Sequence, residues 1–313
     1  MKAAVCYEFG GPEVMQIAEL PEPEAETGQV LIEVHASSVN PIDWKIRQGQ
    51  MASRFGEEFP QRLGFDVSGI VQAVGDGVTE LKVGDSVYAR SNNLAGKCYA
   101  EYVAVDAAVV APKPNGLSHA EAAAIPLAGL TALIGLRDVG CLQQGQRVLI
   151  IGASGGVGTY AVQIAKNMGG HVTAVTSARN RELVRSLGAN AIIDYTRETV
   201  LAEQYDVIYD TVGSQVAAEA QRHLTPNGAY VTLVPQPGVE FFVPGETVRQ
   251  PGGAYFVLWT PTAADLRVLT GWAEQELLRS VIDSEFSLED IQEAHAHSET
   301  QRARGKIVLR IKA

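Results

Sequence analysis

The sequence has few of the features that mark secreted and membrane proteins. It contains only three cysteines, Cys6, Cys98 and Cys141, which lie far apart along 313 residues. This spacing excludes a disulfide framework and a zinc knuckle, and it fits a reducing, cytoplasmic environment. No apolar run is long enough to cross a bilayer, and Met1–Gly11 lacks the long apolar core of a signal peptide.

Basic residues are also scarce. The 25 Lys and Arg residues are outnumbered by 36 Asp and Glu residues, which gives a formal net charge of −11, and no dense basic run occurs. Neither nucleic acid nor an anionic membrane surface is therefore expected as a partner. With 46% hydrophobic and 19% charged residues, the composition is that of a globular protein. The length predicts about two domains.

The most informative segment present is Val148–Gly158. Its apolar start, Val148–Ile151, leads into a turn with glycines at positions 152, 155, 156 and 158, and an apolar segment of helical period follows. A buried strand, a tight turn and a helix start, in this order, form the βαβ unit that binds dinucleotides. The glycines let the backbone approach a pyrophosphate, and the helix N-terminus offers free N–H groups. We predict that this turn binds a dinucleotide; the alternative is a turn whose glycines serve packing alone.

Turn signals divide the chain into a β-rich part and an alternating part. Residues 1–118 are expected to form a barrel-like β domain, because short β-branched runs alternate with turns rich in Gly and Pro. In 119–260, strands alternate with helical segments, which predicts an α/β fold with a doubly wound parallel sheet. The residues alone do not assign 261–313 to either part. The predicted strands are Lys2–Tyr7, Gln29–Ser38, Asp66–Val74, Ser86–Ala89, Ala100–Val105, Arg147–Ile151, His171–Thr176, Ala191–Asp194, Asp206–Tyr209, Ala229–Val234, Ala254–Trp259 and Lys306–Ile311.

The residues that follow the predicted strand His171–Thr176 indicate which dinucleotide binds. In NAD-binding proteins, an Asp or Glu about 20 residues beyond the glycine turn binds the ribose hydroxyls. Here Ser177, Ala178, Arg179 and Asn180 stand at that place, without a carboxylate. A guanidinium suits a 2′-phosphate, and Ser177 adds a hydroxyl. We predict NADPH rather than NADH; helix capping by Ser177 and Asn180 beside a solvated Arg179 is the alternative.

Further stretches occur in a characteristic order along the whole chain: Asn40–Gly49, Leu63–Gly69, Val83–Tyr88, Ala128–Ala132, the glycine turn, Ser186–Ala189 and Gly305–Ile311. Together they resemble the zinc-free medium-chain dehydrogenase/reductases of the quinone oxidoreductase and enone reductase type. The resemblance implies a Rossmann dinucleotide-binding domain, 119–260, inserted into a GroES-like catalytic domain made of 1–118 and 261–313. It also implies NADPH-dependent transfer of hydride to a quinone or an α,β-unsaturated carbonyl.

The resemblance further implies which residues form the site. Asn40 would hydrogen-bond a cofactor or substrate oxygen, although Asn40-Pro41 also fits a simple turn. Lys45 would stabilise negative charge on a carbonyl oxygen, or else lie exposed on a short helix. The expected cofactor-binding residues are Thr131, Gly152, Ala153, Ser154, Gly155, Gly156, Val157, Gly158, Ser177, Arg179, Tyr195, Asp210, Val212, Gly213, Leu233 and Val234.

The zinc ligands of zinc-dependent relatives are missing. Where those relatives carry a Cys and the His of Gly-His-Glu, this chain has Asp43 and Phe65, the latter within Gly64-Phe65-Asp66. Catalytic zinc needs about three protein ligands, so no metal is predicted, and turn formation and hydrogen bonding are the expected roles of Asp43 and Asp66. Quinones and enones fit a site without a Lewis acid, because their reduced anions delocalise charge.

Two other functions compete with the reductase. One is an NADPH-binding regulatory or structural protein with little turnover, against which Asn40 and Lys45 argue. The other is a zinc alcohol dehydrogenase, which the missing ligands oppose. The segment Ala254–Trp259 is apolar on both faces, and an exposed edge of that kind promotes association. Relatives pair this strand across a two-fold axis, so a homodimer is predicted.

Overall fold

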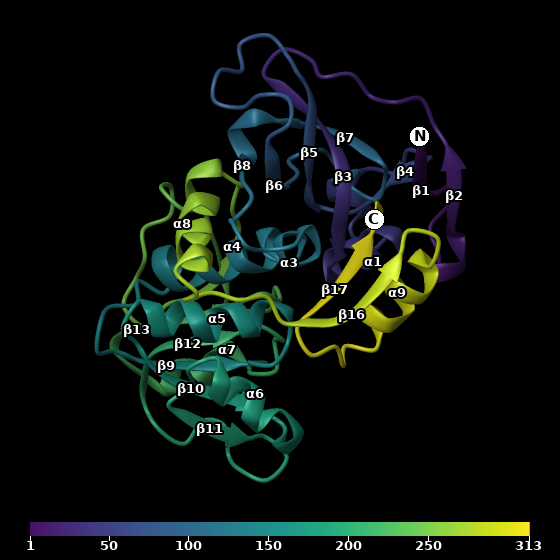
Figure 1. Cartoon of the computed structure of the whole chain (residues 1–313). Coiled ribbons are helices and arrows are strands. Elements are labelled where there is room, and N and C mark those ends of the chain that lie inside the picture. Colours follow the sequence, from purple (N-terminus) through teal and green to yellow (C-terminus); the bar gives the residue numbers. More distant parts are fainter. Residues whose placement is uncertain (313) are drawn as a thin grey trace. The chain divides into compact units, whose positions relative to one another are not determined.

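The computed structural model (Figure 1) describes residues 1–312. The chain forms two compact units, Met1–Leu127 with Pro261–Ala313, and Ala128–Thr260. The first boundary thus follows Leu127, whereas the sequence placed it after residue 118. The difference arises because α3 (His119–Ala123) packs on β3 (Gln29–Val39) and β5 (Asp66–Val74), which are strands of the first unit.

The first unit is mostly β-structure. One sheet has the order β2-β1-β4, and a larger one has the order β16-β17-β3-β5-β6-β8, with β7 paired to β3. Its further strands are β1 (Lys2–Cys6), β2 (Met15–Glu19), β4 (Gln61–Arg62), β6 (Ser86–Arg90), β7 (Tyr102–Asp106), β8 (Val110–Pro112), β16 (Ile282–Ser287) and β17 (Lys306–Arg310). Its other helices are α1 (Pro41–Arg47), α2 (Ala52–Phe55), α8 (Ala263–Glu274) and α9 (Ile291–Glu299).

Strand β3 organises the larger sheet of this unit. Val30, Ile32 and Val34 alternate along it and are fully buried in one apolar cluster with residues of β5, β6 and β7. This period of two is what a strand with one face on a core requires. The last residues of β3 pair antiparallel with β17, which brings the C-terminal segment next to the residues that precede α1. The GroES-like β unit is thereby completed by the tail, as the resemblance implied.

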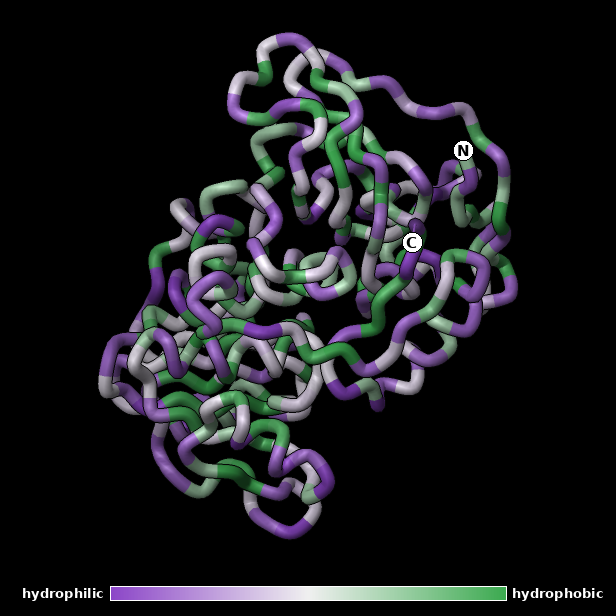
Figure 2. The backbone as a smooth tube through the Cα atoms, viewed as in Figure 1, coloured by the Kyte–Doolittle hydropathy of each residue, from purple (hydrophilic) through white to green (hydrophobic). Residues whose placement is uncertain are grey.

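The second unit is a seven-stranded parallel sheet of order β11-β10-β9-β12-β13-β15-β14, which confirms the expected Rossmann fold. Figure 2 shows hydrophobic residues along its central strands, as strands covered on both faces require. The strands are β9 (Arg147–Ile151), β10 (His171–Thr176), β11 (Ala191–Asp194), β12 (Tyr205–Asp210), β13 (Leu224–Thr232), β14 (Glu240–Phe242) and β15 (Ala254–Val257). The helices are α5 (Gly156–Asn167), α6 (Arg181–Ser186) and α7 (Ala217–Arg222), and α4 (Pro126–Ile134) runs across the boundary into a π-helical turn, Gly135–Val139.

One expectation about this sheet is wrong. The apolar strand β15 is not an edge, because it pairs with β13 on one side and with β14 on the other. The edge is β14, a three-residue strand from a segment rich in Pro and Gly, where Phe241 is 58% exposed. The apolar character of β15 therefore reflects burial within the sheet. Among the described residues, no helix combines the length and the apolar character that crossing a membrane requires.

Candidate cofactor and catalytic sites

The glycine loop, Gly152–Gly158, connects β9 to α5 in the second unit (Figure 1). In the parallel register, Asp210 of β12 lies beside Ile151, and Thr232 of β13 lies beside Asp210. The loop therefore emerges at the same edge of the sheet as the segments that follow β10, β12 and β13. Ligands of doubly wound sheets bind at this edge, at the carboxyl ends of the strands.

Two glycines of the loop accept no side chain. Gly152 has φ +78°, and a Cβ there would lie 2.5 Å from Thr211 Oγ1. A Cβ on Gly158 would lie 2.1 Å from the carbonyl oxygen of Gly152. At Gly155, by contrast, the nearest atom to a Cβ is 3.4 Å away, an ordinary contact. The tight turn thus requires Gly152 and Gly158, whereas Gly155 keeps space beside the backbone.

The N-terminus of α5 has free hydrogen-bonding capacity. Gly155 is its N-cap and has no side chain to cap it. The first N–H groups of a helix have no intrahelical acceptor, so an anion at this position would accept from Gly156, Val157 and Gly158. An uncapped 12-residue helix behind a glycine turn fits a pyrophosphate.

Ser154 fixes the loop to the end of β10. Its Oγ accepts from Thr176 Oγ1 at 3.0 Å and from Asn180 Nδ2 at 2.9 Å. Ala153 N donates to Val175 O, which adds a backbone bond between the same two segments. The sequence did not single out Thr176, and it gave Asn180 only a capping role. The signal for both is their position directly around the end of a buried strand.

The predicted 2′-phosphate residues surround the end of β10 and β11. Ser177 precedes a 3-10 turn, Ala178–Asn180, and Arg179 on that turn is exposed. Tyr195 follows β11 and is 59% exposed. The neighbouring carboxylate of Asp194 is buried and accepts from the backbone and hydroxyl of Thr196, so it is turned into its own loop. The guanidinium of Arg179 and the phenol of Tyr195 are thus both exposed after these two strands.

The segment after β12 is shaped by one carboxylate. Asp210 Oδ1 accepts from Val212 N and Gly213 N, and Oδ2 accepts from Gln215 N and Tyr230 OH. Asp210 therefore holds the turn, while Val212 is 56% exposed beside the glycine loop.

The remaining cofactor candidates of this unit lie behind that turn and on α4. Gly213, at φ +70°, would bring a Cβ within 2.5 Å of Val234, and Leu233 N donates to Asp210 O. Thr131 on α4 is 7% exposed, and its carbonyl accepts from the buried Tyr209 hydroxyl at 2.8 Å.

In the first unit, a set of buried polar side chains, here called the polar cluster, comprises Asn40, Asp43, Asp66, Tyr99 and Lys306. Asp66 is its centre, because its Oδ2 accepts from Ser38 Oγ at 2.5 Å, from Asn40 Nδ2 at 2.8 Å and from Lys306 Nζ at 3.5 Å. Its Oδ1 accepts from Leu127 N at 2.7 Å. The sequence predicted hydrogen-bonding roles for Asp43 and Asp66 but not the contribution of Tyr99.

Asp43 lies at the start of α1 and is fully buried. Its Oδ2 accepts from Asn40 N and from Tyr99 OH, both at 2.7 Å, while its buried Oδ1 has no partner. Burial raises the pKa of this carboxyl to about 7, against the opposing effect of the two hydrogen bonds. Burial also lowers the pKa of Lys306, which the two carboxylates partly restore.

Lys45 occupies a different environment on the same helix. It is two residues from Asp43 and therefore points to another face of α1. Its Nζ lies 5.6 Å from the ring centroid of Trp44, and within residues 1–312 no hydrogen bond or ion pair involves its side chain. The helix thus presents one uncommitted ammonium, whereas Asn40 has both amide groups engaged inside the unit.

The donor set does not fit a metal centre. In the described part of the chain, no group of three or more His, Cys, Asp or Glu side chains is placed to hold a metal ion. Cys98 is buried, and burial raises the pKa of its thiol well above the usual range, so it does not offer a thiolate.

Comparisons with known proteins agree with the fold. Residues 26–115 match the alcohol dehydrogenase GroES-like domain, and residues 187–309 match the zinc-binding dehydrogenase model. The chain is 36% identical over 322 residues to 2-methylene-furan-3-one reductase of Solanum lycopersicum, covering 99% of this chain and 79% of that protein. It is 34% identical over 322 residues to the chloroplastic NADPH-dependent alkenal/one oxidoreductase of Arabidopsis thaliana, with the same coverage.

A solved structure extends this similarity to the whole fold. The quinone oxidoreductase of Coxiella burnetii superimposes with a TM-score of 0.88 at 33% identity, covering 100% of this chain and 99% of that one. Two units with a Rossmann sheet and a GroES-like sheet define an oxidoreductase of the alcohol dehydrogenase fold. The chain belongs to the medium-chain dehydrogenase/reductases, in the group of quinone and enone oxidoreductases.

Proposed function

We propose that this protein is an NADPH-dependent, zinc-independent reductase that transfers a hydride to a quinone or to an α,β-unsaturated carbonyl. The observation that carries the proposal is the end of β10. There, the exposed Arg179 and the half-buried Ser177 follow the strand, and Asp194, the carboxylate at the end of the neighbouring strand β11, is buried in its own turn. A 2′-phosphate would be attracted by this arrangement, whereas the free ribose hydroxyls of NADH would find no acceptor carboxylate.

The residues of the second unit would bind and orient the coenzyme. The N–H groups of Gly156, Val157 and Gly158 would hold the pyrophosphate, and Ser154 would place the loop. Val212, Gly213, Leu233 and Val234 would line its path along the strand ends, with Thr131 and Tyr195 as further contacts. When bound, NADPH supplies the hydride.

Lys45 would provide electrostatic stabilisation. Hydride addition to the β-carbon of an enone leaves negative charge on the carbonyl oxygen, and a nearby ammonium stabilises that charge. Within the described residues the Lys45 ammonium makes no hydrogen bond or ion pair, only a contact with the Trp44 ring, and so is available to a substrate. Asn40 would orient the reacting groups from the start of α1.

Steady-state assays test this proposal directly. Purified protein is dialysed against a chelator and supplied with NADPH or NADH, together with a quinone, a 2-alkenal or the corresponding saturated aldehyde. We expect oxidation of NADPH with the two conjugated acceptors only, at a rate that the chelator does not change. Activity that needs zinc, or that is confined to alcohols and saturated aldehydes, would refute the proposal.

One observation favours a second function, an NADPH-binding regulatory or structural protein with little turnover. Both amide hydrogens of Asn40 are used by Ser38 O and Asp66, so this side chain has no N–H to offer a ligand. NADPH binding measured by fluorescence, without oxidation by any member of the acceptor panel, would support this alternative.

The proposal includes a homodimer in the cytoplasm. Phe241 is exposed on the edge strand β14, and its burial against a second copy would remove an apolar surface. All three cysteines are free, which suits a reducing compartment. Light scattering at micromolar concentration tests the dimer, and cell fractionation tests the location.

A further inference from the structure

The charges within the polar cluster are arranged around one ammonium. Asp43 and Asp66 are fully buried, and Lys306 is 3% exposed. The Lys306 ammonium lies 2.5 Å from Asn40 Oδ1 and 3.5 Å from Asp66 Oδ2. The half-buried Arg90 also interacts electrostatically with both carboxylates. Burial of a carboxylate destabilises the folded state unless a cation contacts it. The Lys306 ammonium therefore contributes to stability in addition to the packing of its aliphatic chain.

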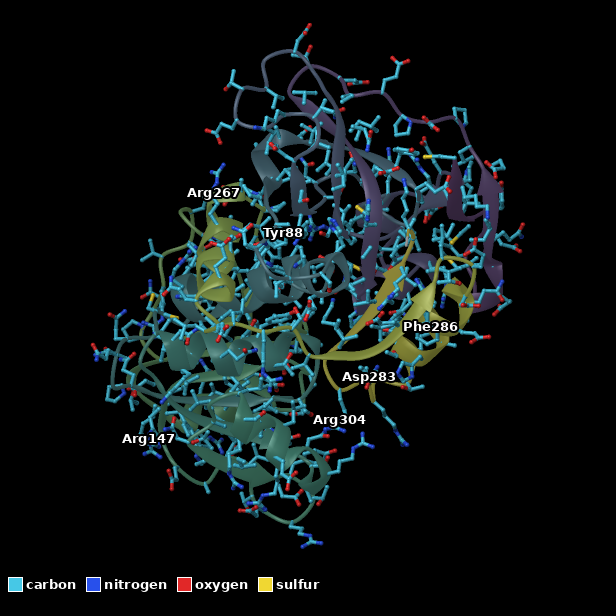
Figure 3. All side chains as sticks on the ribbon, in the orientation of Figure 1. Tyr88, Arg147, Arg267, Asp283, Phe286 and Arg304 are labelled. Carbon is cyan, nitrogen blue, oxygen red and sulfur yellow. The ribbon has the colours of Figure 1, made fainter. Side chains whose placement is uncertain are left out.

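The backbone holds Lys306 in this position. Gly305 before it has φ +96°, and a Cβ there would lie 2.1 Å from Val281 O. Lys306 N donates to that same carbonyl at 2.8 Å, and Arg304 N donates to Asp283 Oδ1 at 2.8 Å. Figure 3 labels Asp283, which belongs to β16, and Arg304, which precedes β17, near each other. The lysine therefore enters β17 along a fixed path.

The same ammonium determines how the Asn40 amide is turned. Asn40 Oδ1 accepts from Lys306, and Asn40 Nδ2 donates to Asp66 Oδ2 at 2.8 Å and to Ser38 O at 3.3 Å. A flipped amide would place its N–H groups against an ammonium and its oxygen against a carboxylate. Only one orientation satisfies all three neighbours.

We propose that Lys306 is a positioning residue: it supplies the polar cluster with a contacting positive charge and holds the Asn40 amide in one orientation. Its ammonium neutralises the carboxylates of this cluster, as a bound cation neutralises its carboxylate ligands, but the charge is carried by the chain itself. The second half of the inference deepens the proposed function, because Asn40 is a proposed catalytic residue there.

A double-mutant cycle tests the charge. Lys306→Met keeps most of the volume but removes the ammonium, and Asp66→Asn removes the carboxylate. Each single variant is expected to raise the unfolding equilibrium constant about 100-fold, because each leaves a buried group without its partner. The double variant is expected to stay within about tenfold of the wild type, since Asn40 can then turn its oxygen towards the amide introduced at position 66.

A surface pair provides the matched control. Lys312 and Glu33 form an ion pair in the same unit, with Lys312 half exposed. The cycle of Lys312→Met and Glu33→Gln should show a coupling below about threefold. If Lys306→Met does not fold, folding of the double variant is the expected result. Additive losses in the Lys306 cycle, or a double variant that also fails to fold, would overturn the charge role.

Two further measurements address Asn40. In the wild type, the Asn40 side-chain N–H groups should exchange slowly with solvent by NMR, and in Lys306→Met or the double variant at least about tenfold faster. The double variant should lose at least about tenfold in kcat while its Kd for NADPH stays within about threefold. Unchanged exchange and kcat would overturn the orienting role. If the wild type itself has no turnover, the proposed function fails, but the stability cycle and the exchange rates still test Lys306.

Discussion

The glycine loop and the polar cluster are built in opposite ways. The loop uses backbone atoms from one stretch of seven residues, Gly152–Gly158, and its shape follows from what the glycines lack. The cluster uses side chains at positions 40, 43, 66, 99 and 306, and its shape follows from hydrogen bonds that span up to 266 residues. The glycine loop is thus formed by one local segment, whereas the polar cluster forms only when distant segments fold together.

This difference predicts different failures. A substitution in the loop should impair binding at one place and leave the second unit folded, because the affected contacts are local. A substitution in the cluster should alter the stability of the first unit, because ionisable groups there are buried. The following changes test this contrast in order of decreasing expected effect.

The largest effect is expected from the pH dependence of the cluster. The folded-state pKa of Asp43 is raised to about 7 from an ordinary value of 3.8, so folding favours the protonated form. Its contribution to stability is full below pH 3.8 and is lost as the pH rises through 7. From pH 4 to 7, the free energy of unfolding of the wild type should therefore fall relative to that of Asp43→Asn, by of order 3 kcal/mol.

Urea unfolding of the two proteins at several pH values, followed by tryptophan fluorescence, measures this difference. The variant keeps an oxygen to accept from Asn40 N and Tyr99 OH, so the comparison isolates the ionisation. A constant difference between pH 4 and 7 would mean that Asp43 is ionised in the folded state and that the cluster tolerates its charge.

In the loop, Gly158→Ala should weaken NADPH binding about 100-fold or more. Its Cβ would meet Gly152 O at 2.1 Å, so the turn must open and the first N–H groups of α5 would move. Gly271→Ala on α8 is the control, because a Cβ there meets no heavy atom within 4 Å. Fluorescence titration with NADPH measures both. Equal losses at the two positions would show that loop compactness is not what binding requires.

The same contrast explains what the sequence could predict. The glycine turn between an apolar strand and a helix is a local pattern, and the structure contains β9, the turn and α5 as expected. Most strands of the two units were likewise predictable from β-branched runs and turn residues, but β2, β4, β8 and β16 were not among the predicted strands. Short elements such as β14 were not predictable, because three residues within a Pro- and Gly-rich segment carry no periodicity.

The polar cluster lies beyond such reasoning for a physical reason. Nothing local at Lys306 distinguishes a lysine that bonds Asn40 from a solvated one, since the antiparallel pairing of β17 with β3 creates the contact. The place of β15 inside the parallel sheet was predictable only in part, because its apolar faces are visible in the sequence but its neighbour β14 is not. A side-chain network between distant segments depends on how the strands pair, and the strand pairing depends on the whole chain rather than on any local pattern.

A third prediction compares Lys45 with Lys306, both in the first unit. Lys45→Met should lower kcat/KM for an enone about 10- to 100-fold, because a partly exposed ammonium contributes less than a buried oxyanion donor. Stability and the Kd for NADPH should stay close to wild type, since within the described residues the Lys45 side chain makes no hydrogen bond or ion pair and contacts only the ring of Trp44. Lys45→Arg, which keeps the charge, should retain most activity. A loss of stability in Lys45→Met comparable to that of Lys306→Met would contradict the distinction between Lys45, whose side chain has no hydrogen bond or ion pair within residues 1–312, and Lys306, which is buried in the polar cluster.

The smallest effect is expected at the end of β10. Arg179→Ala should reduce the ratio of kcat/KM for NADPH to that for NADH about tenfold, the value of one charge-assisted hydrogen bond to a phosphate at an exposed site. Arg185→Ala, on the exposed face of α6, is the matched control and should leave the ratio unchanged. Because the contact is local, neither variant should change the urea midpoint. A ratio that is unaltered in Arg179→Ala would assign phosphate recognition to Ser177 and Tyr195, and a fall in the rates with both coenzymes would mean that Arg179 shapes the turn instead.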